Sequence, residues 1–281
     1  MLSVLEIIKR STEFLAKRGV EAPRLNAELI IGHALGLKRM QLYLQFERPL
    51  TETQLEAIRP LMKRRGNREP VQYIVGETEF GGLKLKVDAR ALIPRPETEL
   101  LLELLAARLP GPPAKILDLG TGSGAIALAL AKAFPAAAVT AVDLSEPALA
   151  LARENRDASG FADRVQLIQS DWFTALPPAE RYQLIVANPP YLSDEEARAA
   201  EPEVREYEPR LALSAGVDGA AALERILAGA PPFLAAAGML ACETGISQHT
   251  RLRERAAAAG FVRTESLRDL TGRDRYLLAF V

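Results

Sequence analysis

The spacing of apolar residues changes along the chain and divides it into segments of different predicted structure. Over residues 1 to about 70, apolar residues such as Leu5 and Ile8 recur at helical spacing, with Glu and Lys between them. Thr51 and Gln54 form the signature of a capping box at the start of a further helix. This segment therefore predicts four or five short amphipathic helices that pack as a small bundle.

A period of two follows between residues 72 and 92. Leu83, Leu85 and Val87 alternate with charged residues directly after the pair Gly81-Gly82. Alternation next to a Gly-Gly pair is typical of a β-hairpin. We expect this hairpin to connect the helical bundle to the remainder of the chain.

From residue 93 onward, short apolar segments alternate with longer helical patterns. The segments expected to be strands are residues 115–118, 139–143, 165–169, 184–187, 239–243 and 276–281. Such alternation predicts an α/β fold of the Rossmann-like kind, with a mostly parallel sheet, helices on both faces and ligands at the carboxyl ends of the strands. The predicted domains are a helical bundle at 1–71, a hairpin linker at 72–92 and a ligand-binding domain at 93–281.

Composition and charge exclude several classes of protein. The chain has 281 residues, 48% of them hydrophobic, which is enough for a large and a small globular domain. Its net charge of −1 argues against a protein that binds nucleic acid or an anionic membrane by charge alone. The densest basic cluster, Lys63, Arg64, Arg65 and Arg68, fits either a solvated helix face or a contact with an acidic protein or RNA.

Cysteine usage and the termini indicate a cytoplasmic protein. The single Cys242 excludes an internal disulfide framework and a cysteine-rich zinc site. The first ten residues carry charges within their apolar segment and lack a small-residue cleavage signal, so we do not expect a secretory leader. We also expect no membrane span, because no apolar run reaches the ~20 residues that a spanning helix needs.

Three polar features follow the first three predicted strands of the second domain. The first is the glycine loop Gly120-Thr121-Gly122-Ser123-Gly124, which allows close backbone approach to a ligand in front of a helix N-terminus. Asp143 ends the second strand, where an acid can bind ribose hydroxyls. Asp171 and Trp172 follow the third, and they suit an exocyclic amine and an aromatic ring. Together they predict a nucleoside pocket, with a nicotinamide dinucleotide still allowed by the glycine spacing.

The fourth predicted strand leads into Asn188-Pro189-Pro190-Tyr191. Each proline fixes its own φ and restricts the residue before it, so the backbone here is stiff. A stiff turn can hold the Asn188 amide, the Pro189 carbonyl oxygen and the Tyr191 ring around one small planar group. By itself, the segment is equally compatible with a turn that only ends a strand.

The order of these motifs resembles that of class I S-adenosylmethionine-dependent methyltransferases that act on planar nitrogens. More narrowly, the chain resembles the peptide-chain release factor glutamine N5-methyltransferase family over nearly its whole length. The segments that carry the narrower resemblance are residues 69–74, 92–99, 118–124, 171–173, 188–191 and 208–213. The N-P-P-Y motif and the glycine loop are shared with adenine N6-methyltransferases, so the finer assignment depends on the other segments.

The resemblance implies a role for each motif. S-adenosylmethionine is the expected methyl donor, S-adenosylhomocysteine the product, and no metal is expected. The glycine loop from Gly120 to Gly124 receives the methionine part of the donor, Asp143 its ribose, and Asp171 and Trp172 its adenine. Arg95, Glu97 and Arg210 hold the cofactor side or the substrate loop.

The expected catalytic residues are Asn188, Pro189, Pro190 and Tyr191. The Asn188 oxygen and the Pro189 carbonyl accept hydrogen bonds from the two N–H groups of a substrate amide, and Tyr191 packs on the amide plane. Positioning of this kind supplies roughly 7 to 11 kcal/mol in well-oriented model reactions.

The resulting hypothesis is methylation of the glutamine in the Gly-Gly-Gln motif of class-I release factors, which the helical bundle binds. Direct nucleic-acid binding and membrane association are not expected. Two alternatives stay open at this point, an adenine N6-methyltransferase of DNA or RNA and a nucleoside-binding protein without catalytic activity.

Overall fold

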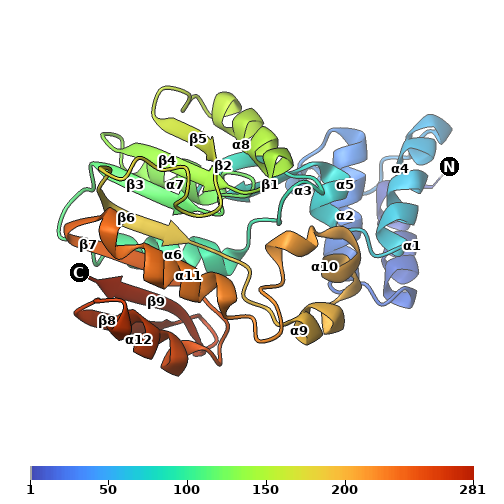
Figure 1. Cartoon of the computed structure of the whole chain (residues 1–281). Coiled ribbons are helices and arrows are strands. Elements are labelled where there is room, and N and C mark those ends of the chain that lie inside the picture. The colour runs from blue at the N-terminus through green and yellow to red at the C-terminus, as the bar shows by residue number, and fades with distance from the viewer. Residues whose placement is uncertain (1) are drawn as a thin grey trace. The chain divides into compact units, whose positions relative to one another are not determined.

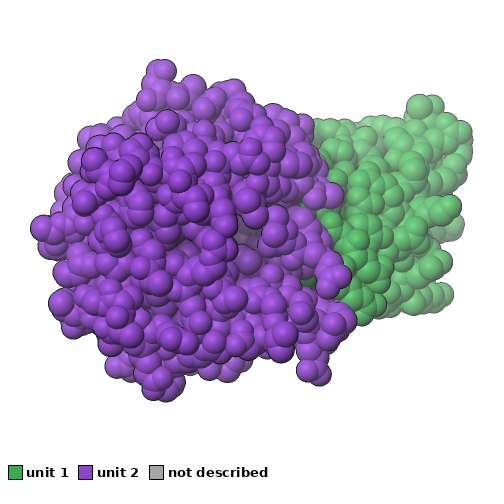
Figure 2. Space-filling model, viewed as in Figure 1, with its two compact units in different colours: residues 1–77, 201–207 green, residues 78–200, 208–281 purple. Residues whose placement is uncertain are grey.

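The computed structural model describes residues 2–281, which form two compact units (Figure 2). Unit 1 consists of the chain up to Glu77 together with Glu201–Tyr207, and unit 2 consists of Thr78–Ala200 and Glu208–Val281. The chain therefore passes between the units three times.

Unit 1 is built from short helices, as the helical spacing of its apolar residues predicts. They are α1 (Val4–Lys17), α2 (Pro23–Leu35), α3 (Arg39–Tyr43), α4 (Glu52–Gly66), α5 (Val71–Val75) and α10 (Pro202–Tyr207). The predicted capping box is confirmed, since Thr51 accepts from the backbone of Gln54 while the Gln54 side chain accepts from the backbone of Thr51. Fully buried aliphatic side chains, including Ile30 and Leu42, form the core of the bundle.

Helix α10 was not predicted, and ion pairs hold it in unit 1. The Glu203 carboxylate accepts from Arg65 Nη2 at 2.8 Å and from Arg68 at 2.7 and 2.6 Å. Arg65 is nearly buried and also donates to the Asn26 side chain at 2.8 Å. The basic cluster is therefore not simply a solvated helix face, because two of its arginines bind α10 within unit 1.

The predicted hairpin is confirmed as β1 (Glu77–Phe80) and β2 (Leu83–Lys86). Phe80 and Leu85 are buried in the same apolar cluster as helix α7 (Ala125–Ala133). The turn is held by Lys132, which donates to the carbonyl oxygens of Gly81 and Gly82.

Unit 2 contains a seven-stranded sheet in the order β5-β4-β3-β6-β7-β9-β8 (Figure 1). The strands are β3 (Lys115–Leu119), β4 (Ala138–Asp143), β5 (Val165–Gln169), β6 (Tyr182–Ala187), β7 (Leu234–Glu243), β8 (Arg263–Arg268) and β9 (Asp274–Phe280). The first five pair in parallel, and β9 pairs antiparallel with both β7 and β8. The predicted α/β fold with a mostly parallel sheet is confirmed.

Helices cover both faces of this sheet because buried strand residues alternate between two apolar clusters. Ile116 and Leu184 belong to one cluster, with α6 (Pro96–Ala106) and α7. Leu117 and Ile185 belong to the other, with α11 (Ala221–Gly229) and α12 (His249–Ala258). Helix α8 (Glu146–Ala158) packs against β4, β5 and the hairpin strand β2. Helix α9 (Asp194–Ala199) and the 3₁₀ turns Arg210–Ala212 and Pro231–Phe233 lie in the connections.

The strand order places a topological switch beside β3. From β3 the chain runs outward to β4 and β5, and it then returns to β6 on the other side of β3. Ligands bind at the carboxyl ends of the strands next to such a switch. The segments that follow β3, β4, β5 and β6 carry the predicted site residues.

Candidate active site

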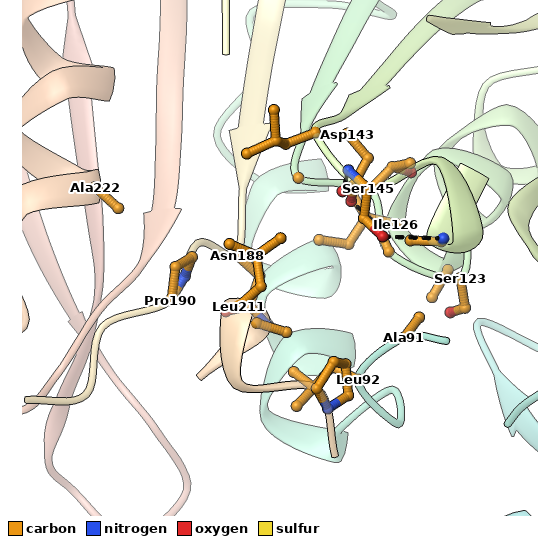
Figure 3. A pocket seen from close by; sticks show the side chains of 18 of the residues that line it. Ala91, Leu92, Ser123, Ile126, Asp143, Ser145, Asn188, Pro190, Leu211 and Ala222 are labelled. Carbon is orange, nitrogen blue, oxygen red and sulfur yellow. Dashed lines mark hydrogen bonds between the residues drawn. The ribbon is translucent and has the colours of Figure 1, made fainter. Parts of the chain in front are cut away.

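A cavity of about 330 Å³ opens at the carboxyl ends of these strands, within unit 2 (Figure 3). The predicted site residues that line it are Arg95, Gly120, Thr121, Gly122, Ser123, Asp143, Asp171, Trp172, Asn188 and Pro190. In the close-up, Asn188 and Pro190 stand on one side, and Ser123, Asp143 and Ser145 on the other. The structure thus brings together the motifs that follow four separate strands.

The glycine loop forms a tight turn between β3 and α7. The N–H groups of Gly120 and Thr121 both donate to the carbonyl of Val142 at 2.9 Å. Gly120 has a φ of +73°, a left-handed conformation that favours glycine, and a Cβ there would lie 3.5 Å from the Trp172 ring. The loop therefore brings its backbone to the cavity wall without side chains that would fill the cavity.

The carboxylate of Asp143 is fixed at the end of β4. One oxygen accepts from the backbone N–H of Gly122 at 2.8 Å, and the other accepts from that of Ser145 at 2.9 Å. Burial raises the pKa of this carboxyl, and the backbone hydrogen bonds oppose the rise. The position is suited to accept hydrogen bonds from vicinal hydroxyls.

Asp118, on β3 behind the glycine loop, is fully buried. Its Oδ2 accepts from the Thr121 hydroxyl at 2.6 Å and from the Ala127 N–H at 3.1 Å. Its Oδ1 has no hydrogen-bond partner among the described residues. Burial raises the pKa of Asp118 to about 7.

Asp171 and Trp172 lie where the third predicted strand ends. Asp171 accepts from Arg225 on α11 at 2.7 Å, so its carboxylate is already paired within the protein. Trp172 has a φ of +55°, a conformation that costs a non-glycine residue about 1–3 kcal/mol. Its indole lies against Gly120 and packs on the apolar cluster that contains α11. Trp172 therefore serves both the cavity wall and the core.

Asn188 faces the cavity, and its side-chain nitrogen is engaged. Its Nδ2 donates to the Thr98 hydroxyl at 2.9 Å, and Thr98 donates to Glu243 at 2.7 Å. The Tyr191 hydroxyl donates to the other oxygen of Glu243 at 3.0 Å. Burial, together with the Glu243 charge, raises the pKa of Tyr191.

The segment after Asn188 is held from two sides. Leu192 pairs with the segment that follows the first 3₁₀ turn, through Leu192 N to Leu213 O at 3.1 Å and Ala215 N to Leu192 O at 3.0 Å. Gly219 passes so close that a Cβ there would lie 2.4 Å from the Tyr191 carbonyl oxygen. The turn is therefore stiff through tertiary contacts as well as through its prolines.

The Arg95 and Glu208 segments meet at the cavity. Arg95 donates to Glu208 at 2.5 Å, and the backbone N–H of Ile93 donates to the other Glu208 oxygen at 3.3 Å. Burial raises the pKa of Glu208 although the Arg95 charge opposes the rise. This pair fixes the edge of the cavity from which the Arg95 side chain, about one-third exposed, reaches solvent.

Five predicted site residues are not among the described residues that line the cavity, and one of them, Arg210, is exposed between the lining residues Pro209 and Leu211. Gly124 caps α7 and packs against Ala152 on α8. Pro189 is buried, and the Tyr191 hydroxyl donates to Glu243. The Glu97 side chain is exposed, and its backbone carbonyl accepts a hydrogen bond from the Tyr276 hydroxyl. These residues hold or flank the cavity wall.

Four residues of the site and its surroundings were not predicted as site residues from the sequence: Thr98, Glu243, Arg225 and Asn155. Glu243 ends a predicted strand, which is the same signal that identified Asp143. Asn155 lies inside α8, and its side chain donates to the carbonyls of Lys86 and Ser123 and accepts from the Lys86 N–H. No spacing in the sequence links it to the glycine loop.

The residues present fit a nucleoside that carries a short cationic chain. The cavity offers backbone groups of the glycine loop, the Asp143 carboxylate and a wall that includes the Trp172 indole. Behind the loop, the buried Asp118 carboxyl holds Thr121 and the start of α7 through its Oδ2, so it fixes the loop that lines the cavity. The described residues contain no group of three or more His, Cys, Asp or Glu arranged to hold a metal ion.

A sheet of this order, with a glycine loop after its first strand, is typical of the class I S-adenosylmethionine-dependent methyltransferases, and the match to a methyltransferase domain assigns the chain to this class. A methyltransferase of Pyrococcus furiosus shares the fold, with a TM-score of 0.54 over 71% of this chain and 89% of that one, at 20% identity. Residues 96–205 match the methyltransferase small domain, and residues 6–76 match the PrmC N-terminal domain.

Relatives extend over the full chain. A release factor glutamine methyltransferase of Chlorobaculum tepidum is 42% identical over 284 residues, which cover 98% of this chain and 96% of the relative. A release factor glutamine methyltransferase of Rhodopirellula baltica is 40% identical over 285 residues, which cover 98% of this chain and 95% of the relative. The chain belongs to the release factor glutamine methyltransferase family.

Proposed function

We propose that the protein transfers a methyl group from S-adenosylmethionine to the side-chain amide nitrogen N5 of the glutamine in the Gly-Gly-Gln motif of class-I peptide chain release factors. S-adenosylhomocysteine is the second product, and no metal takes part. Family membership supports the substrate class. The proposal also includes a cytoplasmic location. No helix in residues 2–281 has the length and apolarity to span a membrane.

The observation that carries the proposal is the position of Asn188 on the cavity wall with its amide nitrogen turned to Thr98. The amide oxygen is then the group available to a substrate N–H. A primary amide nitrogen is a weak nucleophile because its lone pair is delocalised into the carbonyl. Acceptors on both of its N–H groups favour a more tetrahedral nitrogen, and we assign these roles to Asn188 Oδ1 and the Pro189 carbonyl.

S-adenosylmethionine supplies a sulfonium-bound methyl group when it is bound. The glycine loop and Asp143 hold the donor on the side of the cavity opposite Asn188, in keeping with their positions in Figure 3. Asp171 and Trp172 surround its base, and Pro190 closes the wall beside Asn188. Catalysis by alignment requires no group with a shifted pKa in direct contact with the nitrogen.

The helical unit contributes binding of the protein substrate. Unit 1 carries exposed apolar side chains, including Met40 at 69% and Leu44 at 85% exposure, which suit contact with a protein more than with a nucleic acid. Arg95, Glu97 and Arg210 are assigned to the substrate loop or to the cofactor side of the cavity. Direct binding of nucleic acid and of membranes is not part of the function.

Incubation with S-adenosylmethionine labelled in the methyl group tests the proposal. The substrates are a class-I release factor and its variant with Gly-Gly-Gln changed to Gly-Gly-Ala. We expect label on the first only, resistant to nuclease and lost with Asn188→Ala. Equal labelling of both, or label that nuclease removes, would refute the glutamine assignment, and the second outcome would identify an adenine N6-methyltransferase.

A further inference from the structure

A chain of hydrogen bonds runs from Glu243 through Thr98, which lines the cavity, to Asn188 on the cavity wall. Glu243, at the end of β7, is 2% exposed, and Thr98, in the first turn of α6, is 4% exposed. The bonds run from Asn188 Nδ2 to Thr98 Oγ1 at 2.9 Å and from Thr98 Oγ1 to Glu243 Oε2 at 2.7 Å. All three residues belong to unit 2.

The chemistry of the three groups sets the direction of this chain. An ionised carboxylate only accepts hydrogen bonds, and a threonine hydroxyl has one proton to donate. When the Thr98 hydroxyl donates its hydrogen bond to Glu243, its oxygen can only accept a hydrogen bond from Asn188. The Asn188 amide must then present its NH₂ group to Thr98.

An asparagine amide has two orientations of nearly the same shape that exchange its oxygen and its nitrogen. Only one of them suits a substrate nitrogen that carries its own N–H groups, because the opposite orientation would set NH₂ against NH₂. Among residues 2–281, no hydrogen bond engages Asn188 Oδ1, so this oxygen is available at the cavity wall.

We propose that Thr98 and Glu243 are positioning residues that fix the Asn188 amide with its oxygen toward the cavity. The orientation of the Asn188 amide does not depend on the identity of the substrate. The contribution of this orientation to glutamine methylation rests on the proposed function. In this role both residues act on the reaction through the Asn188 amide, Thr98 by a direct hydrogen bond and Glu243 through Thr98.

Glu243 also connects the two ends of the N-P-P-Y turn. Its Oε1 accepts from the Tyr191 hydroxyl while its Oε2 accepts from Thr98, so both carboxylate oxygens are used. One buried carboxylate therefore orients the first residue of the motif through Thr98 and the last residue directly. Hydrogen bonds to an ionised acceptor are stronger than neutral ones, which suits a group that must resist an amide flip.

Protonation of Glu243 would reverse the chain. A neutral carboxyl can donate to Thr98, Thr98 can then donate to Asn188, and the amide would turn its nitrogen to the cavity. Burial raises the pKa of Glu243, and the negative charge of Glu97 on α6 raises it further. The hydrogen bonds from Thr98 and Tyr191 and the positive charge of Arg275 on β9 oppose this rise. We expect turnover to fall as the pH is lowered through this raised pKa.

Selective labelling observes the orientation without turnover. The chain has four asparagines, at positions 26, 67, 155 and 188, so protein labelled with side-chain ¹⁵N-asparagine gives four NH₂ signal pairs, and Asn188→Ala assigns one of them. In Thr98→Val, which keeps the shape and removes the hydroxyl, we expect solvent exchange of the Asn188 pair to accelerate at least tenfold. The Asn155 pair, which bonds Lys86 and Ser123, serves as the internal control. An unchanged Asn188 pair in Thr98→Val would overturn the proposal.

Kinetics tests the consequence for the reaction. We expect Thr98→Val to lower kcat about tenfold, a factor that corresponds to 1.4 kcal/mol, with KM for the release factor and affinity for S-adenosylhomocysteine changed less than about twofold. Thr98→Ser, which restores the hydroxyl, is expected to recover the wild-type rate, and Glu243→Gln to lose the acidic limb of the pH profile. Wild-type kcat in Thr98→Val, or an unaltered acidic limb in Glu243→Gln, would refute the positioning role. Failure of the wild-type enzyme to methylate release factors would instead refute the proposed function, and the NMR result would still decide the orientation.

Discussion

Asn155 connects three elements around the glycine loop, and its replacement by leucine tests whether this connection stabilises unit 2. The variant leaves three backbone partners unpaired, the N–H and the carbonyl of Lys86 and the carbonyl of Ser123. Water can reach the Lys86 groups, for which we assign a loss of about 1 kcal/mol each, whereas the buried Ser123 bond costs up to about 3 kcal/mol. Burial of the leucine side chain offsets about 2 kcal/mol of this loss. The net expectation is a decrease of about 3 kcal/mol in the free energy of unfolding of unit 2.

Trp172 is the single tryptophan of the chain, and it lies in unit 2 at the cavity wall, so its fluorescence reports on this unit. Urea unfolding followed at this residue measures the loss, and calorimetric titration with S-adenosylhomocysteine measures the expected severalfold weaker binding. Arg153→Leu places the same side chain at an exposed site of the same helix and should change the free energy by less than about 0.5 kcal/mol. If the midpoints of the two variants coincide, the bonds of Asn155 contribute nothing to stability and our reasoning is wrong.

Three further predictions concern other parts of the chain. Gly219→Ala places a Cβ 2.4 Å from the Tyr191 carbonyl oxygen at a φ of +68°. We expect the free energy of unfolding to fall by about 1–3 kcal/mol or more. We also expect a larger loss of kcat than of cofactor affinity. Asp118 has its pKa raised to about 7, so the folded protein retains a proton there that the unfolded chain releases above about pH 4. The free energy of unfolding therefore falls as the pH rises from about 4 to 7, and Asp118→Asn should flatten this slope in urea midpoints measured across that range. Glu203→Ala removes the acceptor of two arginines, so trypsin should cleave after Arg205 in α10 severalfold faster.

Matched variants separate these effects from general damage. Gly216→Ala has a comparable φ of +88°, and no atom of residues 2–281 lies within 4 Å of the new Cβ, so it isolates backbone strain from the collision at Gly219. Asp163→Asn, an exposed site, should leave the pH slope unchanged. Glu195→Ala, at an exposed position of α9, should leave the cleavage rate near that of the wild type. If a control behaved like its partner variant, the corresponding mechanism would be refuted.

Much of the fold follows from local patterns. The six predicted strands are present because buried strands, five of them parallel and β9 antiparallel, carry continuous apolar residues. The hairpin is present because Gly-Gly adopts the required turn. Strand β8 was missed, since it is an edge strand whose sequence, Arg263 to Arg268, is mostly polar and only partly buried. An edge strand pairs through its backbone and needs no apolar alternation.

The residues of the candidate site also fall into a group that the sequence predicts and a group that it does not. Residues directly after strands were predictable because topology brings strand ends together, as it does for Gly120, Asp143 and Asn188. Contacts between distant segments were not predictable, because no local pattern specifies them. Thr98 and Glu243 are 145 residues apart in the sequence, and Asn155 reaches the glycine loop across 32 residues.

The membership of α10 in unit 1 bears on how the protein is made. Arg65 is nearly buried, yet its carboxylate partner Glu203 is synthesised 138 residues later. At the usual ~5–20 residues per second, the ribosome supplies that partner roughly 7–30 s after Arg65. The N-terminal helices thus leave the ribosome with the Arg65 guanidinium bonded only to neutral groups, Asn26 and the Glu69 carbonyl, and they gain its carboxylate partner only when about three-quarters of the chain exists. A truncated product that ends before residue 201 would keep an incomplete helical unit and offer it to the cell's proteases.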